Sequence, residues 1–251
     1  LTELQQAELD ILDVVVGICK KHHLHYYLNA GSMLGAIRHE GFIPWDDDID
    51  ICMPRTDYEI FLACVDDELP DHMRSIYYKK QKKGERLFYS CQIHDLDVPL
   101  IQNIAQNPIE TYAWLDIFPL DGLPDNKYLR KLHGFYLLYR RARMQLSMFE
   151  DNVNIYKKNR PWYEKAIIKA YQITGFGKHS DPHKMMDQLD KALKRCSDRK
   201  CKRWVCFMGA YKLKEAYDAR VFGKGKDYPF EGRMLKGPSY ADIYLKGLYG
   251  D

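Results

Sequence analysis

The sequence has no long hydrophobic run and no strong excess of charge of either sign. No apolar run approaches the roughly 20 residues that a membrane-spanning helix needs, and the chain, which begins at Leu1, does not open with a charged region followed by an apolar one. Its 38 basic and 35 acidic residues give a net charge of only +3, too weak a bias to indicate a nucleic-acid partner. We therefore expect a cytoplasmic globular protein without a transmembrane segment.

The sequence also lacks an even set of cysteines that would suggest a disulfide framework. Seven cysteines in a chain of 251 residues predict reduced thiols in a reducing compartment. Cys196, Cys201 and Cys206 could be proposed as zinc ligands, but four residues separate each neighbouring pair. We favour ordinary buried or surface thiols over a zinc site.

The hydrophobic pattern predicts an α/β (α+β) protein whose two halves differ in character. In the first half, periodicity predicts helices, and β-prone runs predict strands, over the ranges 4–18, 25–30, 33–38, 49–53, 57–69, 86–94 and 112–118. In the second half, helical periodicity dominates over 126–149, 161–174, 183–197 and 240–248. We predict a mixed-sheet catalytic core at 1–125 and a mainly helical region at 126–251 that packs on it, with a soft boundary.

The densest chemical signal is the run of aspartates that leads into the strand predicted at 49–53. Residues two apart in a strand point to the same face, so Asp48 and Asp50 should project together while Ile49 turns into the core. Two carboxylates on one face repel each other unless a cation compensates them, and Mg²⁺, with Mn²⁺ as an alternative, suits a pair of oxygen ligands beside a phosphate. The alternative is a set of solvated aspartates that cap a strand entry.

A second signal is the Gly31-Ser32 turn between a predicted strand and a predicted helix. Gly31 allows close backbone approach, Ser32 offers a hydroxyl, and the helix start attracts anions, so the turn predicts a phosphate cradle. Arg38 could contact phosphate, and His39 is a weaker candidate for the same role. The alternative is an ordinary turn followed by solvated side chains.

The third signal is Asp116, an acidic residue among strand-like apolar neighbours. A charge in such a place is costly unless it is paired or bound to a metal, so Asp116 is the expected third ligand. Pairing with a nearby arginine is the alternative. Asp121 precedes Gly122 and is typical of a turn.

The residues 28–39 and 41–50, LNAGSMLGAIRH and GFIPWDDDID, together resemble the LicD family, which includes bacterial phosphocholine transferases and is related to fukutin and fukutin-related protein. Residues 114–121, 230–232 and 240–251 resemble further family segments, so the resemblance covers nearly the whole chain. One departure is Ala30, where the commoner family form has a glycine.

The resemblance implies a nucleotidyltransferase-like fold and transfer of a phospho-substituent, typically phosphocholine from CDP-choline, to a hydroxyl of a cell-surface glycan such as teichoic acid or lipopolysaccharide, or of its lipid-linked precursor. Carried over by position, Gly31 and Ser32 match the phosphate-binding turn, and Asp48, Asp50 and Asp116 match the metal-binding carboxylates. Three alternatives remain open: a nucleotide-sugar glycosyltransferase, a nucleotidyltransferase and a non-catalytic binding protein. For the basic stretch 220–236 we favour a solvated loop; contact with an anionic acceptor or with the inner face of a membrane is the alternative.

Overall fold

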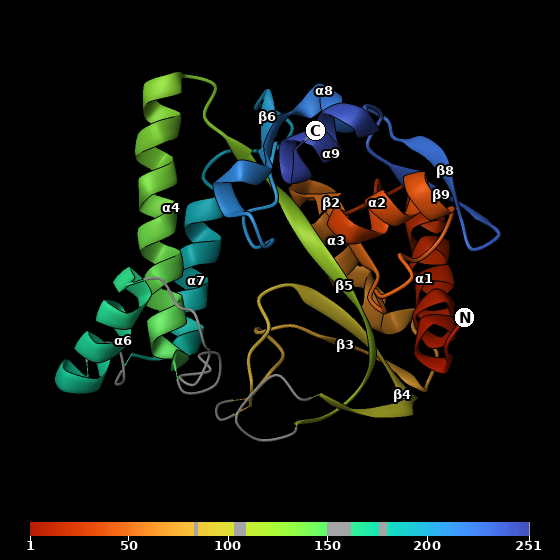
Figure 1. Ribbon diagram of the computed structural model, residues 1–251, viewed down its shortest axis with the longest axis horizontal. Helices are drawn as coiled ribbons and strands as arrows, with labels where there is room; N and C mark the ends of the chain where they lie inside the picture. Colours follow the sequence, from red (N-terminus) through yellow and green to blue (C-terminus); the bar gives the residue numbers. More distant parts are fainter. Residues whose placement is uncertain (83–84, 103–108, 150–161, 176–179, 251) are drawn as a thin grey trace.

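The computed structural model describes residues 1–82, 85–102, 109–149, 162–175 and 180–250 (Figure 1). The helices are α1 (Glu3–Lys21), α2 (Ala30–His39), α3 (Arg55–Cys64), α4 (Lys127–Ser147), α6 (Trp162–Thr174), α7 (Pro182–Leu193), α8 (Ala219–Phe222) and α9 (Ala241–Tyr249), with 3-10 turns η1 (Val65–Asp67) and η2 (Lys212–Glu215). The strands are β1 (Tyr27–Leu28), β2 (Asp50–Pro54), β3 (Met73–Ile76), β4 (Cys91–Gln102), β5 (Ile109–Leu123), β6 (Arg203–Val205), β7 (Ala216–Asp218), β8 (Lys226–Phe230) and β9 (Arg233–Gly237).

The fold is α/β, with a mixed sheet in the order β1-β2-β5-β4-β3. Strand β5 lies at its centre, parallel to β2 and antiparallel to β4 (Figure 1). The end of β5 continues into pairing with β6, which in turn pairs with β7, whereas β8 and β9 form a separate hairpin. The parallel contact between β2 and β5 is the one that matters most for the site described below.

Local sequence signals account for the first helix. The Thr2 hydroxyl accepts the Gln5 backbone N–H, and the Gln5 side chain accepts the Thr2 N–H, so the predicted capping box closes α1 at its start. The apolar face of the helix, including Leu12 and Val15, is fully buried. The predicted helix is therefore confirmed, and its burial against the sheet supplies most of its stability.

The structure differs from several strand predictions. Strand β3 was not predicted, and β5 does not end before Pro119 but runs on to Leu123. Pairing of β5 with β4 stops at Ile117, so Pro119 has a neighbouring strand on one side only, and its missing N–H breaks no ladder there. The stretch predicted as a solvated loop at 220–236 instead contains α8 and most of the β8–β9 hairpin.

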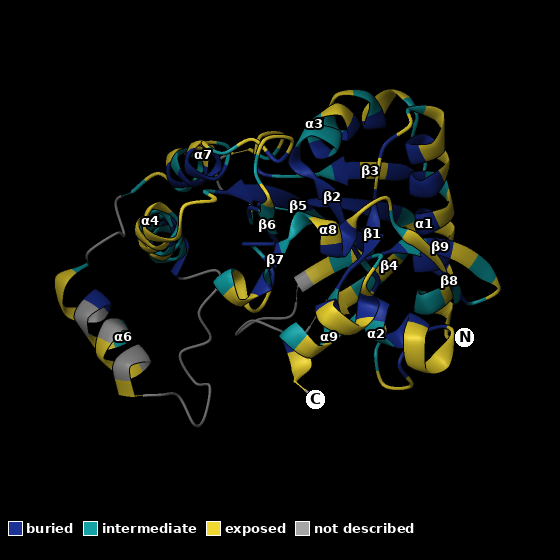
Figure 2. Cartoon of the chain, turned by 90° about the horizontal axis from the view of Figure 1, so that it is seen from above, coloured by how far each residue is buried: buried dark blue, intermediate teal, exposed yellow. Residues whose placement is uncertain are grey.

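The second half of the chain adds to two cores. The larger core surrounds the sheet and includes Tyr217, Phe222, Phe230 and Tyr244 beside residues from the first half. Figure 2 shows much of the central sheet in dark blue, the colour of buried residues. A smaller core lies between α4, α7 and the end of the sheet, and contains Leu137 and other residues. In the part of the chain that the structure describes, no helix is both long and apolar enough to span a membrane.

Candidate active site

The parallel pairing of β2 with β5 brings the predicted carboxylates together. Asp50 lies opposite Asp116 in the register, and the Asp116 N–H donates to the Ile49 carbonyl at 3.3 Å. Asp48 is exposed, Ile49 is buried and Asp50 is partly exposed, which is the expected alternation. The three aspartates therefore converge from β5, from the start of β2 and from the segment that leads into β2.

The convergence of like charges shows in the pKa values of these groups. Desolvation, followed by the carboxylate of Asp46, raises the pKa of Asp48 to about 7 although its side chain still reaches solvent. Desolvation, followed by the charges of Asp116 and Asp48, raises the pKa of Asp50 well above its usual value. The fold thus brings acidic side chains together without placing a basic side chain of the described residues beside them to balance their charge.

A hydrogen-bond network orients Asp116. Its Oδ1 accepts from Gln92 Nε2 at 3.0 Å and Ser90 Oγ at 3.3 Å, and its Oδ2 accepts from Trp114 Nε1 at 2.9 Å. Burial raises the pKa of Asp116, and these donors oppose that rise. Gln92 Oε1 in turn lies 3.0 Å from His94 Nε2, which fixes the orientation of the Gln92 amide. Gln92 and His94, which lie on β4, were not predicted from the sequence. The register of β4 against β5 brings them to Asp116, and their spacing along the chain gives no sign of it.

The chemistry of this donor set fits a hard divalent cation. All three side chains offer oxygen atoms, and among the described residues none of the three pairs with a lysine or arginine. Within the described chain, only His22, Cys64 and Glu68 bring three potential ligand atoms within 4.8 Å of one another. The carboxylate oxygens of the three aspartates are therefore more widely separated than the atoms of such a closed cluster. Mg²⁺ usually takes one or two carboxylates and completes its shell with water and phosphate, which suits this open arrangement.

The Gly31-Ser32 segment forms the first turn of α2 instead of the predicted turn before the helix. Ser32 Oγ accepts the Asp50 N–H at 2.8 Å, so the helix start is joined to β2. A Cβ at Gly31 would lie 2.9 Å from Asp46 Oδ2, so a side chain there would require the Asp46 carboxylate to shift. In the described chain the N–H groups of Gly31 and Ser32 donate to no acceptor, as expected at a helix N-terminus that can receive an anion.

The C-terminal helix supports this turn. Tyr244 of α9 accepts the Ala30 N–H at 3.0 Å and donates to Asn29 Oδ1 at 2.7 Å. Ala30 has φ of +40°, a left-handed conformation that an L side chain adopts at a cost. The departure from glycine at this position therefore leaves the turn formed but strained.

A buried acid lies behind the aspartate run. Glu8 of α1 is 1% exposed, and burial, followed by the charges of Asp48 and Asp47, raises its pKa to about 10. It accepts a hydrogen bond from the Ile49 backbone, so it holds the start of β2 as a neutral acid. Its sequence signal is its position four residues after Leu4, on the apolar face of the helix.

Arg38 and His39 lie exposed in the last turn of α2. Within the described residues, neither side chain makes a hydrogen bond or ion pair to Asp48, Asp50 or Asp116. Their predicted contact with phosphate stays a prediction.

Asp121 was predicted as a turn residue, and this was wrong. It is 1% exposed and receives two hydrogen bonds from Arg55, from Nε at 2.7 Å and from Nη2 at 3.0 Å. Arg55 also donates to Asp190 Oδ1 at 3.2 Å. The sequence did not reveal this ion-pair network because Asp190 is far along the chain on α7.

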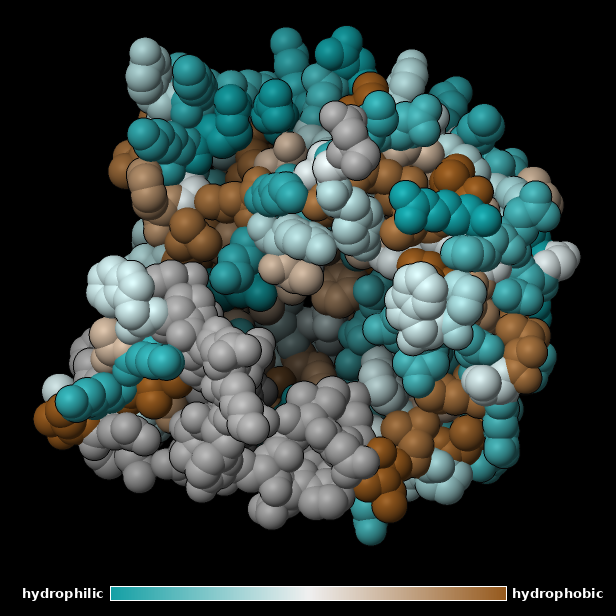
Figure 3. All heavy atoms as spheres, viewed as in Figure 1, coloured by the Kyte–Doolittle hydropathy of each residue, from teal (hydrophilic) through white to brown (hydrophobic). Residues whose placement is uncertain are grey.

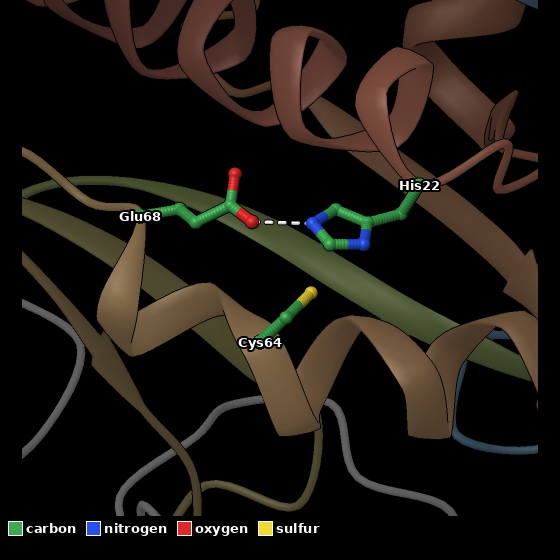
Figure 4. Close-up of side chains that lie close together, drawn as sticks. All are labelled: His22, Cys64 and Glu68. Carbon is green, nitrogen blue, oxygen red and sulfur yellow. Dashed lines mark hydrogen bonds and ion pairs between the residues drawn. The ribbon is translucent and has the colours of Figure 1, made fainter.

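The three-residue cluster His22, Cys64 and Glu68 is a separate feature, formed where the C-terminal ends of α1, α3 and η1 meet (Figure 4). His22 Nε2 is hydrogen-bonded to Glu68 Oε1, and Lys21 Nζ lies 3.1 Å from Glu68 Oε2. These two basic partners already account for the position of Glu68. We interpret the cluster as an ion pair that joins the end of α1 to the segment after α3.

Comparisons with known proteins find relatives that match the same part of the chain. Residues 23–121, which contain all three aspartates, match the family described as LicD/FKTN/FKRP, nucleotidyltransferase domain. The chain is 26% identical over 253 residues to the lipopolysaccharide cholinephosphotransferase LicD of Haemophilus influenzae, covering 100% of this chain and 90% of that protein.

Two further relatives match shorter segments. An uncharacterized protein of Rickettsia prowazekii is 32% identical over 151 residues, which is 59% of this chain and 52% of that protein. Human ribitol 5-phosphate transferase FKRP is 49% identical over 108 residues, which is 41% of this chain and 21% of that protein. Together with these similarities, the family match shows a LicD-family domain over residues 23–121, the segment that holds the site.

Proposed function

We propose that the protein is a phosphotransferase that moves phosphocholine from CDP-choline to a hydroxyl of a cell-surface glycan or its lipid-linked precursor, with Mg²⁺ or Mn²⁺ as cofactor. The observation that carries the proposal is the convergence of Asp48, Asp50 and Asp116 beside the free N–H groups at the start of α2. The relatives with named activities support it, because one is a cholinephosphotransferase and another a ribitol 5-phosphate transferase. Both names describe transfer of a phosphate that carries a small substituent.

In the proposed reaction, a hydroxyl oxygen of the acceptor forms a bond to the phosphorus that carries choline. The bond between that phosphorus and the bridging oxygen breaks, CMP leaves with the electron pair, and the hydroxyl proton is released. The start of α2 would hold the donor phosphates through the N–H groups of Gly31 and Ser32. The Ser32 hydroxyl keeps this turn in register with Asp50, because it accepts the Asp50 N–H.

Asp48, Asp50 and Asp116 would hold the divalent ion. When bound, the ion would supply charge neutralisation for the diphosphate and the leaving oxygen. Asp116 is oriented by three donors that engage both of its oxygens. This suits a fixed ligand better than a group that turns to accept a proton, so we assign Asp116 the ligand role.

The test is an assay with CDP-choline labelled in either the base or the choline, together with Mg²⁺ and a glycan acceptor. We expect only the choline label to reach the product, and we expect Asp50→Asn to lower turnover by about a thousandfold, since charge stabilisation at the reacting phosphate is lost. Asp47→Asn, which removes an exposed charge three residues from Asp50, is the matched control and should retain activity within about threefold.

Three other results would point elsewhere. Base label in the product would indicate a nucleotidyltransferase, and transfer only from a nucleotide sugar would indicate a glycosyltransferase. Turnover of Asp50→Asn near that of the unmodified protein would contradict the assignment of the site. CDP-ribitol serves as a competing donor, because a human relative is a ribitol 5-phosphate transferase.

A further inference from the structure

Helix α4 combines many positive charges with a complete lack of negative ones. Over Lys127–Ser147 the sequence contains six basic residues and no aspartate or glutamate, although acidic and basic residues are almost equal in number in the whole chain. The six are Lys127, Arg130, Lys131, Arg140, Arg141 and Arg143. The local charge therefore differs from that of the rest of the molecule.

The same helix carries an exposed apolar stripe. Five large side chains are more than half exposed: Tyr128 at 81%, Leu129 at 59%, Leu132 at 68%, Phe135 at 60% and Tyr139 at 54%. Four of them follow the helical repeat, at intervals of four, three and four residues, and so lie along one face. Figure 3 shows hydrophobic residues among hydrophilic ones on the side of the molecule where Figure 1 draws α4.

The opposite face of α4 fixes the helix to the protein. Leu137 and Met144 are buried in the smaller core, which α7 also lines. Arg140 Nη1 donates to Gln188 Oε1 at 2.6 Å, and Arg141 is bonded to the Phe207 carbonyl. The exposed stripe is therefore held outward by a rigid attachment, and Lys127 and Lys131 beside it are exposed and form no ion pair within the described chain.

The other basic stretch of the chain is different. Arg233 forms two hydrogen bonds with Asp13, Lys236 pairs with Asp227, and Arg220 pairs with Asp218. Three of the five basic residues of that stretch therefore have an acidic partner, whereas Lys224 and Lys226 have none among the described residues. Helix α4 differs because Lys127 and Lys131, which have no acidic partner among the described residues, lie beside an exposed apolar stripe, and this was not predicted from the sequence.

We propose that the first half of α4 (Lys127–Tyr139) docks on the surface of a membrane rich in anionic lipids. Tyrosine, leucine and phenylalanine side chains suit the boundary between headgroups and acyl chains, and flanking lysines suit anionic headgroups. A second copy of the chain would bring two strongly positive helices together, which their mutual repulsion opposes. A membrane gives the stripe both an apolar phase and a counter-charge.

The test is co-sedimentation of the full chain with vesicles, using phosphatidylcholine mixed with phosphatidylglycerol and, separately, phosphatidylcholine alone. We expect binding to the mixed vesicles that weakens as salt is raised. K127Q/K131Q should bind about 30-fold more weakly, from about fivefold for each charge. L132Q/F135Q should weaken binding by about tenfold or more, because the apolar side chains that enter the membrane are lost.

Matched controls keep the result interpretable. K20Q/R74Q removes two exposed charges from other elements, and I60Q removes an exposed apolar side chain from α3; both should bind as the unmodified protein does. Equal binding by K127Q/K131Q and its control, or absence of binding to the mixed vesicles at low salt, would overturn the proposal. A dimer that L132Q/F135Q disperses in size-exclusion chromatography would assign the stripe to self-association instead.

Discussion

Two groups of acidic side chains that share strand β5 have opposite electrostatic surroundings. Burial and the neighbouring Asp116 carboxylate raise the pKa values of Asp48 and Asp50, and none of these three aspartates has a basic partner among the described residues. Asp121, five residues further along β5, is buried against Arg55, and Arg55 also binds Asp190. For Asp121, burial raises the pKa and the Arg55 guanidinium opposes that rise.

This comparison separates two uses of a buried carboxylate. In the Arg55 network, the charges are balanced inside the fold, so the network contributes to structure. In the aspartate cluster the compensating charge must come from outside, so the cluster costs stability until a cation binds. The predictions below test this distinction, from the largest expected effect to the smallest.

Asp121→Asn should lower the free energy of unfolding by about 3 to 5 kcal/mol, because it leaves the buried Arg55 charge poorly compensated. Asp50→Asn should not lower it in buffer without divalent ions, because the substitution relieves repulsion. Urea denaturation of both variants measures the difference. Equal destabilisation by the two substitutions would show that the clusters do not differ as we describe.

Tyr244→Phe should lower the free energy of unfolding by about 1 to 2 kcal/mol, because it leaves Asn29 Oδ1 without its donor in a buried place. We also expect weaker binding of the donor, since the turn before Ser32 loses its support. Tyr240→Phe serves as the control, because Tyr240 is 58% exposed. Thermal unfolding and donor titration give the two readouts.

Ala30→Gly should raise the free energy of unfolding by about 1 kcal/mol, since glycine adopts the positive φ at Ala30 without strain. Ala36→Gly, in the interior of α2, should lower it by about 1 kcal/mol. Chemical denaturation of the two variants measures these opposite changes in the free energy of unfolding. A loss of stability in both variants would mean that Ala30 is not strained.

The contribution of Asp48 to the pH dependence of stability should be the smallest effect, because water partly screens this exposed side chain. Its folded-state pKa of about 7 lies above the unfolded value of 3.8, so the folded state binds the proton more tightly. In chelating buffer, Tm should therefore decline as pH rises from about 4 to about 7.

Two comparisons isolate the contribution of Asp48 to that decline. Glu8, whose pKa is raised to about 10, adds a decline of the same sign that extends to higher pH. Asp48→Asn should flatten the curve between pH 4 and 7, and added Mg²⁺ should flatten it in the unmodified protein. An unchanged slope in Asp48→Asn would assign the decline to other groups.

Local signals in the sequence were sufficient for many elements. The capping box at Thr2 and Gln5 predicted the start of α1, and helical periodicity predicted α4, α7 and α9 close to their observed ranges. The alternation around Ile49 predicted that Asp48 and Asp50 lie on the same side. Each of these properties depends on residues within a few positions of one another.

Partners distant in the sequence were decided by the tertiary structure. The pairing of Asp50 with Asp116, the hydrogen bond from Gln92 to Asp116 and the burial of Asp121 against Arg55 all depend on strand register and helix packing. The family resemblance anticipated the first of these, and nothing in the local pattern anticipated the others. The sequence by itself determined which segments form helices and where the acidic residues lie along the chain. Only the folded chain decided which charges are balanced, because electrostatic energy depends on distance in space and on exclusion of water.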